Sequence, residues 1–193
     1  AEFIRMNATG CSYMLVNESE KTACRVDMNM TGLYNVQNSL CAIAMVTALG
    51  FDMTECAKAL SDLDGVDGRM NVVYRGDFTV ITDYAHTDDA LIKVLSTLKP
   101  LTKGRLICVF GAAGDRDKEK RPMMAKAAED NADILVITSD NPAHENPDEI
   151  IREVMTGISG KKPCRCITDR REAIAYALDT ARKDDVIILC GKG

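Results

Sequence analysis

Leu106-Ile107-Cys108-Val109-Phe110 and Ile134-Leu135-Val136-Ile137-Thr138 are two short apolar runs, and each opens into a polar loop. The first loop reads Gly111-Ala112-Ala113-Gly114-Asp115-Arg116-Asp117-Lys118, and the second reads Ser139-Asp140-Asn141-Pro142-Ala143-His144-Glu145-Asn146. Apolar runs of this length, rich in Val and Ile, are typical of buried parallel strands. Because parallel α/β sheets bind ligands outside the carboxyl ends of their strands, the sequence predicts a functional site at these two loops.

Strand and helix patterns alternate along the chain from Met70 onward. Thr87 and Asp169 are residue types that cap helices, and Asn146 precedes Pro147, which suits a first helical position. The alternation predicts an α/β fold in which residues 67–193 form a Rossmann-like, doubly wound domain with a mostly parallel sheet. The predicted strands and helices are, in chain order, Asp77–Asp83, Thr87–Leu98, Arg105–Phe110, Lys118–Asn131, Asp133–Thr138, Pro147–Gly157, Pro163–Ile167, Asp169–Arg182 and Asp185–Leu189.

Residues 1–66 carry a different pattern. Cys11–Val16 and Cys24–Met30 are expected to form two antiparallel strands, followed by helices at Asn35–Leu49 and Thr54–Leu63. Two strands and two helices bury too little apolar surface to be stable alone. We therefore interpret residues 1–66 as the remnant of a larger domain whose first part precedes this chain.

Composition excludes several classes of protein. The chain has 193 residues, 46% of them hydrophobic, and a formal net charge of -5 without a long basic run, which argues against a nucleic-acid partner. No apolar run approaches the roughly 20 residues that a membrane helix needs, and the first residues lack the pattern of a signal peptide. The eight cysteines include no C-x-x-C pair, so we expect reduced thiols in a cytoplasmic protein and no metal site among them.

The polar side chains of the two loops suit the two ends of an amino acid. The guanidinium of Arg116 can hold a carboxylate through two hydrogen bonds, and Asp140 and Asn141 can accept from an ammonium group. The alternatives are a solvated loop, in which Arg116 pairs only with a neighbouring acid, and a plain Asn-Pro turn.

A third polar cluster, Asp83-Tyr84-Ala85-His86-Thr87, follows the strand that ends at Asp83. His86 could orient a phosphate or a ribose, or it could simply precede the next helix as a structural residue. Asn35 and Asn38 lie at a helix start, where Asn is a common capping residue.

Together these motifs resemble the Mur ligase family, and within it the members that add the third amino acid of the peptidoglycan stem peptide. The resemblance covers nearly the whole chain, with six motifs in the family's order. They are Gly32–Leu40, Gly68-Arg69, Asp83–Thr87, Gly114–Lys118, Asp140-Asn141-Pro142 and Gly191-Lys192-Gly193.

The resemblance implies an ATP- and Mg²⁺-dependent ligase that joins an amino acid to UDP-N-acetylmuramoyl-L-alanyl-D-glutamate through an acyl phosphate. We expect it to be a monomer that acts on small-molecule substrates. Residues 1–66 would then be the end of the ATP-binding central domain, and residues 67–193 the C-terminal domain. The resemblance implies nucleotide binding by Asn35, Asn38, Arg69, Asp83 and His86. It implies amino-acid binding by Arg116, Asp140, Asn141, Pro142, Ala143 and Gly191.

Three departures from the family pattern qualify this expectation. The family's phosphate-binding loop, magnesium ligands and muramyl-binding domain precede the region seen here, and its C-terminal motif stops at Gly193, before the expected His and Glu. Asp88 stands where the family usually has Pro. We therefore expect the fragment alone to be inactive.

Ala143 bears on the choice of amino acid. Family members that use diaminopimelate carry Arg at this position, so Ala143 predicts L-lysine, whose ε-ammonium Glu145 could help to receive. The alternatives are a ligase of the folylpolyglutamate synthetase type, and a non-catalytic module that binds an amino acid or a nucleotide.

Overall fold

The computed structural model describes residues 1–192, which form two compact units, one from Ala1 to Val66 and a second that begins at Asp67. Each unit has its own sheet and its own hydrophobic core. Gly193, the last residue of the Gly191–Gly193 motif, lies outside the described residues.

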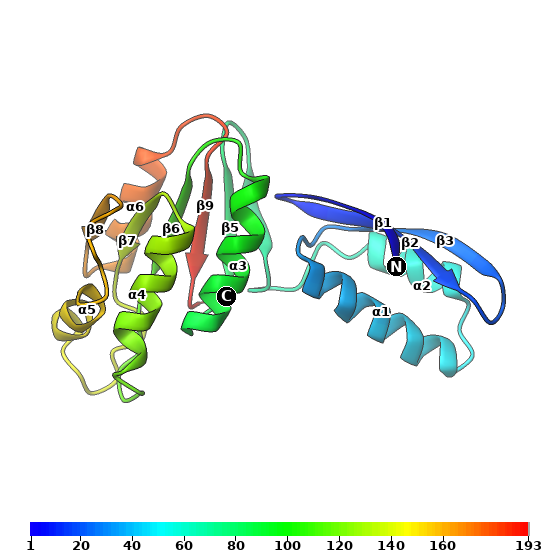
Figure 1. Ribbon diagram of the computed structural model, residues 1–193, viewed down its shortest axis with the longest axis horizontal. Helices are drawn as coiled ribbons and strands as arrows, with labels where there is room; N and C mark the ends of the chain where they lie inside the picture. The colour runs from blue at the N-terminus through cyan, green and yellow to red at the C-terminus, as the bar shows by residue number, and fades with distance from the viewer. Residues whose placement is uncertain (193) are drawn as a thin grey trace. The chain divides into compact units, whose positions relative to one another are not determined.

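The first unit contains a three-stranded antiparallel sheet in the order β1-β2-β3 (Figure 1). The strands are β1 (Glu2–Asn7), β2 (Gly10–Asn17) and β3 (Thr22–Met28). Alternate residues of β2 are buried, because successive side chains of a strand point to opposite faces. These buried residues line the face of the sheet that forms the core of the unit.

Helices α1 (Leu33–Ala48) and α2 (Met53–Ser61) contribute the rest of that core. The hydroxyls of Tyr13 in β2 and Ser39 in α1 are hydrogen-bonded at 2.8 Å, which ties α1 to the sheet. Asp52 caps α2 by accepting from the backbone N–H groups of Thr54 and Glu55. The buried core residues are Cys11, Tyr13, Leu15, Val26, Met28, Met30, Val36, Ile43, Met53 and Ala57.

The second unit is built on a six-stranded sheet in the order β4-β5-β9-β6-β7-β8. All neighbouring pairs are parallel except β4 with β5, which confirms the predicted mostly parallel α/β sheet. The strands are β4 (Asn71–Arg75), β5 (Thr79–Asp83), β6 (Leu106–Phe110), β7 (Ile134–Ile137), β8 (Cys164–Cys166) and β9 (Val186–Cys190).

Helices cover both faces of this sheet (Figure 1). Helices α3 (Asp88–Leu98), α4 (Lys120–Asn131) and α5 (Pro147–Met155) pack in sequence against one another, and a 3-10 turn, η1 (Lys99–Leu101), follows α3. Helix α6 (Arg170–Thr180) places Ala173 and Ala177 against Ile107, Val109 and Val136. The predicted caps are present, because Thr87, Asn146 and Asp169 accept from backbone N–H groups in the first turns of α3, α5 and α6.

The structure corrects the expected elements in two places. The first sheet has three strands instead of two, because β1 pairs with β2 although every one of its residues is exposed. The second sheet gains β4, which also has no fully buried residue. Both strands lie at the edge of a sheet. An edge strand can pair with its neighbour without burying alternate side chains, so the sequences of β1 and β4 show no clear hydrophobic alternation.

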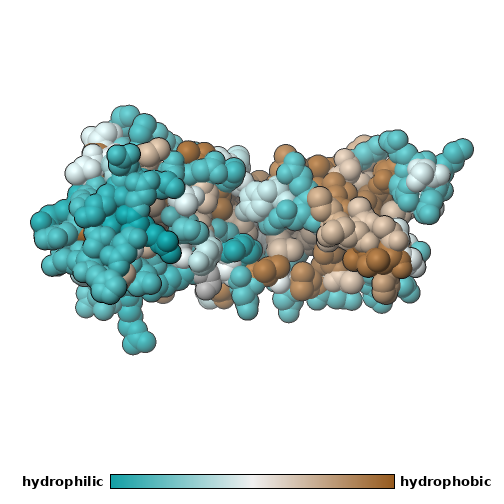
Figure 2. Space-filling view, turned by 90° about the horizontal axis from the view of Figure 1, so that it is seen from below, coloured by the Kyte–Doolittle hydropathy of each residue, from teal (hydrophilic) through white to brown (hydrophobic). Residues whose placement is uncertain are grey.

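The surface of the first unit is rich in apolar side chains around α1 and α2, and Figure 2 shows them as brown patches. Met45, Leu49 and Phe51 are more than half exposed. A groove of about 390 Å³ lies beside them and is lined by Ala42, Ile43, Val46, Phe51, Glu55, Cys56, Ala59, Leu60 and Leu63. Among residues 1–192, no helix has the length and apolar character that crossing a membrane requires.

Candidate functional site

The loops after β6, β7 and β9 lie at one edge of the second unit, because these three strands are parallel neighbours. The loop after β6 carries Arg116, the loop after β7 carries Asp140 to Ala143, and the chain after β9 continues into Gly191. Parallel pairing therefore brings together the three segments in which the sequence predicted amino-acid binding. We call these three segments the rim.

Backbone contacts hold the first two loops of the rim against each other. The N–H of Gly114 donates to the carbonyl oxygen of Asn141 at 2.8 Å. A Cβ atom at position 114 would lie 1.9 Å from the carbonyl oxygen of Pro142, which no side chain can tolerate. Gly114 is therefore required for the close approach of the two loops.

The third segment of the rim approaches Asp140. A Cβ atom at Gly191 would lie 2.8 Å from Oδ2 of Asp140, and Gly191 has a φ of +104°, which favours glycine. The N–H of Gly191 donates to the carbonyl oxygen of Asp83 at 3.0 Å. Asp140 is half-buried beside this glycine, so its carboxylate and the backbone of Gly191 face a common space.

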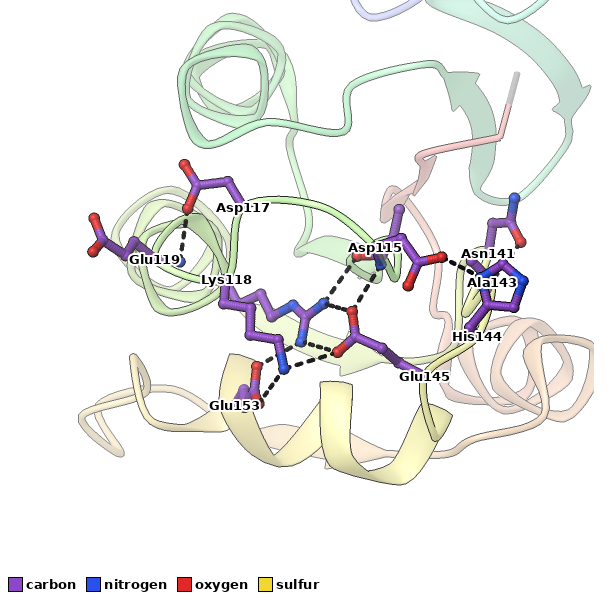
Figure 3. Close-up of polar contacts among 11 residues, drawn as sticks. Asp115, Asp117, Lys118, Glu119, Asn141, Ala143, His144, Glu145 and Glu153 are labelled. Carbon is purple, nitrogen blue, oxygen red and sulfur yellow. Dashed lines mark hydrogen bonds and ion pairs between the residues drawn. The ribbon is translucent and has the colours of Figure 1, made fainter.

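Next to the rim lies a group of charged side chains that we call the Arg121 cluster: Arg121, Lys118, Glu145 and Glu153. Figure 3 labels its members Lys118, Glu145 and Glu153. The guanidinium of Arg121 is only 1% exposed and donates to both oxygens of Glu145, at 2.8 and 2.9 Å, and to Glu153 at 2.5 Å. Its Nη2 also donates to the carbonyl oxygen of Ala113 at 3.3 Å. One buried cation thus joins the loop after β6, the loop after β7 and helix α5.

Glu145 connects this cluster to the tip of the first loop. Its Oε1 accepts from the backbone N–H of Asp115 at 2.7 Å, and the hydrogen bonds from Arg121 lower the pKa of Glu145 to about 2. Asp115 and Ala143 both have positive φ, +55° and +49°, a conformation that costs more for a residue with a side chain than for glycine. Nδ1 of His144 lies 2.5 Å from Oδ2 of Asp115, and the contact raises the pKa of His144.

Arg116 follows Asp115 directly and is exposed. Among residues 1–192 it forms no ion pair, so the expected alternative, pairing with Asp115, Asp117 or Glu119, is not the arrangement found. Glu145, by contrast, is occupied by Arg121, Lys118 and the N–H of Asp115. The expectation that Glu145 receives a ligand's ammonium group is therefore wrong, because its charge is already neutralised.

The residues expected to bind a nucleotide in the second unit gather around Tyr84. The guanidinium carbon of Arg69 lies 4.8 Å from the centroid of the Tyr84 ring, and the His86 ring stands edge-on to it at 4.8 Å. Arg69, Tyr84 and His86 are all exposed, so they offer a cation, an aromatic face and an imidazole to the solvent. Such a set can stack on a base and contact a phosphate.

Asp83 stands apart from that exposed set. It is 6% exposed, and its two carboxylate oxygens accept from the backbone N–H groups of Met70 and Ala85, each at 2.8 Å. Burial raises the pKa of Asp83, although both hydrogen bonds and the charge of Arg69 oppose the rise. The structure thus places Asp83 where it fixes the backbone beside Arg69 and His86.

Asn35 and Asn38 both lie in the first turns of α1, in the first unit. Asn35 is buried, and its Nδ2 donates to the carbonyl oxygen of Thr31 at 2.8 Å, whereas Asn38 is exposed. Neither is the N-cap of α1, since that position is Gly32. Their contact with adenine stays a prediction.

Sequence reasoning missed Arg121, Glu153 and the contact between Asp115 and His144. Arg121 stands next to Lys120 in a charged segment, and its partner Glu145 lies 24 residues away, so no local spacing could have paired them. The two positive-φ residues also left no signal, since neither is Gly or Asn. Within residues 1–192, no group of three or more His, Cys, Asp or Glu side chains could hold a metal ion, and all eight cysteines are free.

Comparisons with known proteins add a second line of evidence. Residues 68–193 match the family described as Mur ligase, glutamate ligase domain. The chain is 44% identical over 195 residues to the UDP-N-acetylmuramoyl-L-alanyl-D-glutamate–2,6-diaminopimelate ligase of Caldanaerobacter subterraneus subsp. tengcongensis, a match that covers 100% of this chain and 40% of that protein. The chain therefore spans about 40% of the length of this curated relative.

Two solved structures are similar to this chain. A UDP-N-acetylmuramoyl-L-alanyl-D-glutamate–2,6-diaminopimelate ligase aligns with a TM-score of 0.71 at 36% identity, over 100% of this chain and 39% of the other. Folylpolyglutamate synthase of Mycobacterium tuberculosis aligns with a TM-score of 0.76 over 98% of this chain and 44% of the other, but its 18% identity indicates a shared fold alone.

The comparisons overturn the prediction of L-lysine. Relatives at 44% and 36% identity are both named for 2,6-diaminopimelate. The prediction rested on one residue, Ala143, and on a free Glu145, and the structure removes the second support because Glu145 is paired with Arg121. The absence of a charge at Ala143 does not exclude a second carboxylate on the ligand, because the cation Arg116 is exposed on the same rim.

Proposed function

Since this chain belongs to the Mur ligase family, we propose that it forms part of an ATP-dependent ligase that joins 2,6-diaminopimelate to UDP-N-acetylmuramoyl-L-alanyl-D-glutamate through an amide bond. The contact between the rim loops is the observation that supports this proposal most directly, with the N–H of Gly114 2.8 Å from the carbonyl oxygen of Asn141. This contact brings Arg116, Asp140 and Asn141 to one edge, where they can bind an amino acid. We also propose that the enzyme acts in the cytoplasm, in keeping with its eight free thiols.

The rim offers complementary groups to the two ends of the amino acid. Asp140 and Asn141 would accept from the ammonium group that becomes the nucleophile, and Arg116 would hold a carboxylate through paired hydrogen bonds. Diaminopimelate has a second carboxylate, and Ala143 provides no charge for it, so Arg116 is the cation we assign to that end. Fixing the amine in one orientation lowers the entropic cost of its attack.

In the second unit, Arg69, Tyr84 and His86 would bind the nucleotide. In the first unit, Asn35 and Asn38 stay proposed nucleotide-binding residues on the family resemblance alone. The exposed cation and aromatic face around Tyr84 suit a nucleotide, because a base can stack on the ring while Arg69 contacts a phosphate. ATP with Mg²⁺ would supply the phosphoryl group that activates the acceptor's carboxylate. The residues of this chain would bind and orient the nucleotide and the amino acid.

The proposal is tested with the full-length protein that contains this chain. Purified protein is mixed with ATP, Mg²⁺, UDP-N-acetylmuramoyl-L-alanyl-D-glutamate and meso-diaminopimelate, and both phosphate release and the mass of the nucleotide-linked product are recorded. We expect a product heavier by one diaminopimelate residue, with one phosphate released per product. L-Lysine and glycine in place of diaminopimelate serve as comparison substrates.

Replacing Arg116 by Met sharpens the test. We expect a large rise in the KM for diaminopimelate with little change in the KM for ATP, since Arg116 is assigned to the amino acid alone. Phosphate release without an amide product, or a product formed equally well with the comparison amino acids, would contradict the proposed function.

A further inference from the structure

Arg121 contacts the loops of the proposed amino-acid site, although its own side chain is only 1% exposed. We propose that Arg121 is a positioning residue for amino-acid binding, which acts through Glu145 to hold Asp115 in its strained conformation and so directs Arg116 toward the ligand. This inference rests on the proposed function, because it concerns the same rim. It adds a residue that is not expected to contact any of the substrates.

The first step of the argument is the location of Arg121. Its side chain is 1% exposed, so it cannot meet a ligand, and it lies on α4, behind the loop that carries Arg116. It donates to both oxygens of Glu145 and to Glu153, which balances its buried charge with two carboxylates. A buried guanidinium held in this way is rigid, because its hydrogen bonds fix the plane of the group.

The second step runs from Glu145 to Asp115. The carboxylate that Arg121 fixes accepts the backbone N–H of Asp115 at 2.7 Å. Asp115 has a φ of +55°, which costs energy for a residue with a side chain, and the hydrogen bond from its N–H to Glu145 helps to offset that cost. His144, beside Glu145, adds a second contact to the carboxylate of Asp115 (Figure 3).

The third step runs from Asp115 to Arg116. The two residues share a peptide bond, so the backbone dihedrals of Asp115 decide the direction in which Arg116 leaves the loop. Arg116 is exposed and has no ion pair among residues 1–192 to orient it. The backbone that Glu145 and Arg121 hold therefore sets the direction in which the Cα–Cβ bond of Arg116 leaves the loop.

The experiment measures three variants of the full-length protein: Arg121→Met, Glu145→Ala and the double variant. Each single change is expected to raise the KM for diaminopimelate roughly 10- to 100-fold, the scale that a misplaced binding group can produce, while the KM for ATP stays within about twofold. If Arg121 acts through Glu145, the KM for diaminopimelate of the double variant should be no higher than that of Glu145→Ala. The effects of two residues that act through the same contact are not additive.

Lys126→Met is the matched control. Lys126 lies on the same helix as Arg121, is exposed, and pairs only with Asp130 of its own helix among the described residues. It is expected to leave every KM unchanged. Arg121→Lys is the second variant if Arg121→Met does not fold, and one ammonium in place of a guanidinium fork should give an intermediate KM.

Hydrogen exchange of the peptide over residues 111–118 separates this inference from the proposed function. Arg121→Met and Glu145→Ala should both speed the exchange of the Asp115 amide, whether or not the protein ligates diaminopimelate. If the wild-type protein is inactive while exchange responds as expected, the proposed function fails and the positioning contact stands. Unchanged exchange, equal rises in the KM for ATP and diaminopimelate, or additive effects in the double variant would each overturn the inference.

Discussion

Two carboxylates near the same edge of the second unit are held in opposite ways. Asp83, at the end of β5, is buried and accepts two backbone N–H groups at 2.8 Å. Glu145, in the loop after β7, accepts from Arg121 and Lys118 as well as from the N–H of Asp115. Asp83 therefore fixes the path of the backbone, whereas Glu145 links side chains from separate elements.

The pKa values of the two carboxyl groups follow from this difference. Burial raises the pKa of Asp83, because its backbone partners carry no full charge to offset desolvation. The guanidinium of Arg121 lowers the pKa of Glu145 to about 2. The comparison teaches that an acid inside a sequence motif, Asp83, can stabilise the fold, while an acid outside the motifs, Glu145, can organise the loops of the site.

The largest expected effect comes from Asp83→Ala. The change leaves the N–H groups of Met70 and Ala85 buried without acceptors, and we expect it to lower the free energy of unfolding by about 2–4 kcal/mol. Urea denaturation measures this loss. Asp89→Ala is the control, because the one ion pair of Asp89 within residues 1–192 is an exposed pair with Lys93. Its loss should cost less than about 0.5 kcal/mol. Similar losses in the two variants would show that the backbone bonds of Asp83 do little for the fold.

The sequence predicted the parts of the fold and the rim that local patterns encode. The apolar runs of β6 and β7 predicted buried strands, and the parallel order of the strands then placed Asp140 beside Gly191. Pairing between distant residues could not be predicted, because no local pattern links Arg121 with Glu145. The edge strands β1 and β4 were missed for a related reason, since their pairing depends on a neighbouring strand and not on their own burial.

A smaller effect is expected from Gly114→Ala, which tests whether the backbone contact alone keeps the rim together. A Cβ atom at 114 would lie 1.9 Å from the carbonyl oxygen of Pro142, so the loops must separate, at a cost of about 1–3 kcal/mol. Gly160→Ala is the matched control, because its Cβ would meet nothing within 4 Å and only its φ of +83° opposes the change, at about 1 kcal/mol.

Binding of diaminopimelate to the full-length variants, followed by calorimetry, distinguishes the two glycine positions further. Gly114→Ala should weaken binding at least tenfold, because separation of the loops moves Arg116 away from Asp140 and Asn141. Gly160→Ala should leave affinity unchanged. Equal affinities in both variants would mean that the contact between Gly114 and Pro142 has no part in amino-acid binding.

The smallest expected effect is on the pH dependence of stability: as the pH falls, the contributions of Glu145 and Asp83 to the free energy of unfolding should change in opposite directions. The folded pKa of Glu145, about 2, lies below its ordinary value of 4.5, so its contribution to stability is complete above pH 4.5 and is lost as the pH falls toward 2. The folded pKa of Asp83 is raised above 3.8, so the native state binds this proton more tightly than the unfolded state does. The stability that this proton contributes is present at low pH and is lost as the pH rises through the folded pKa.

The free energies of unfolding of wild type, Glu145→Gln and Asp83→Asn are measured from pH 6 to pH 3. As the pH falls, the difference in unfolding free energy between wild type and Glu145→Gln should become smaller. Over the same range, Asp83→Asn should become less stable relative to wild type. Two gaps that change in the same direction would mean that Asp83 and Glu145 are stabilised by the same kind of contact, and the contrast between a backbone-held and a charge-held carboxylate would not stand.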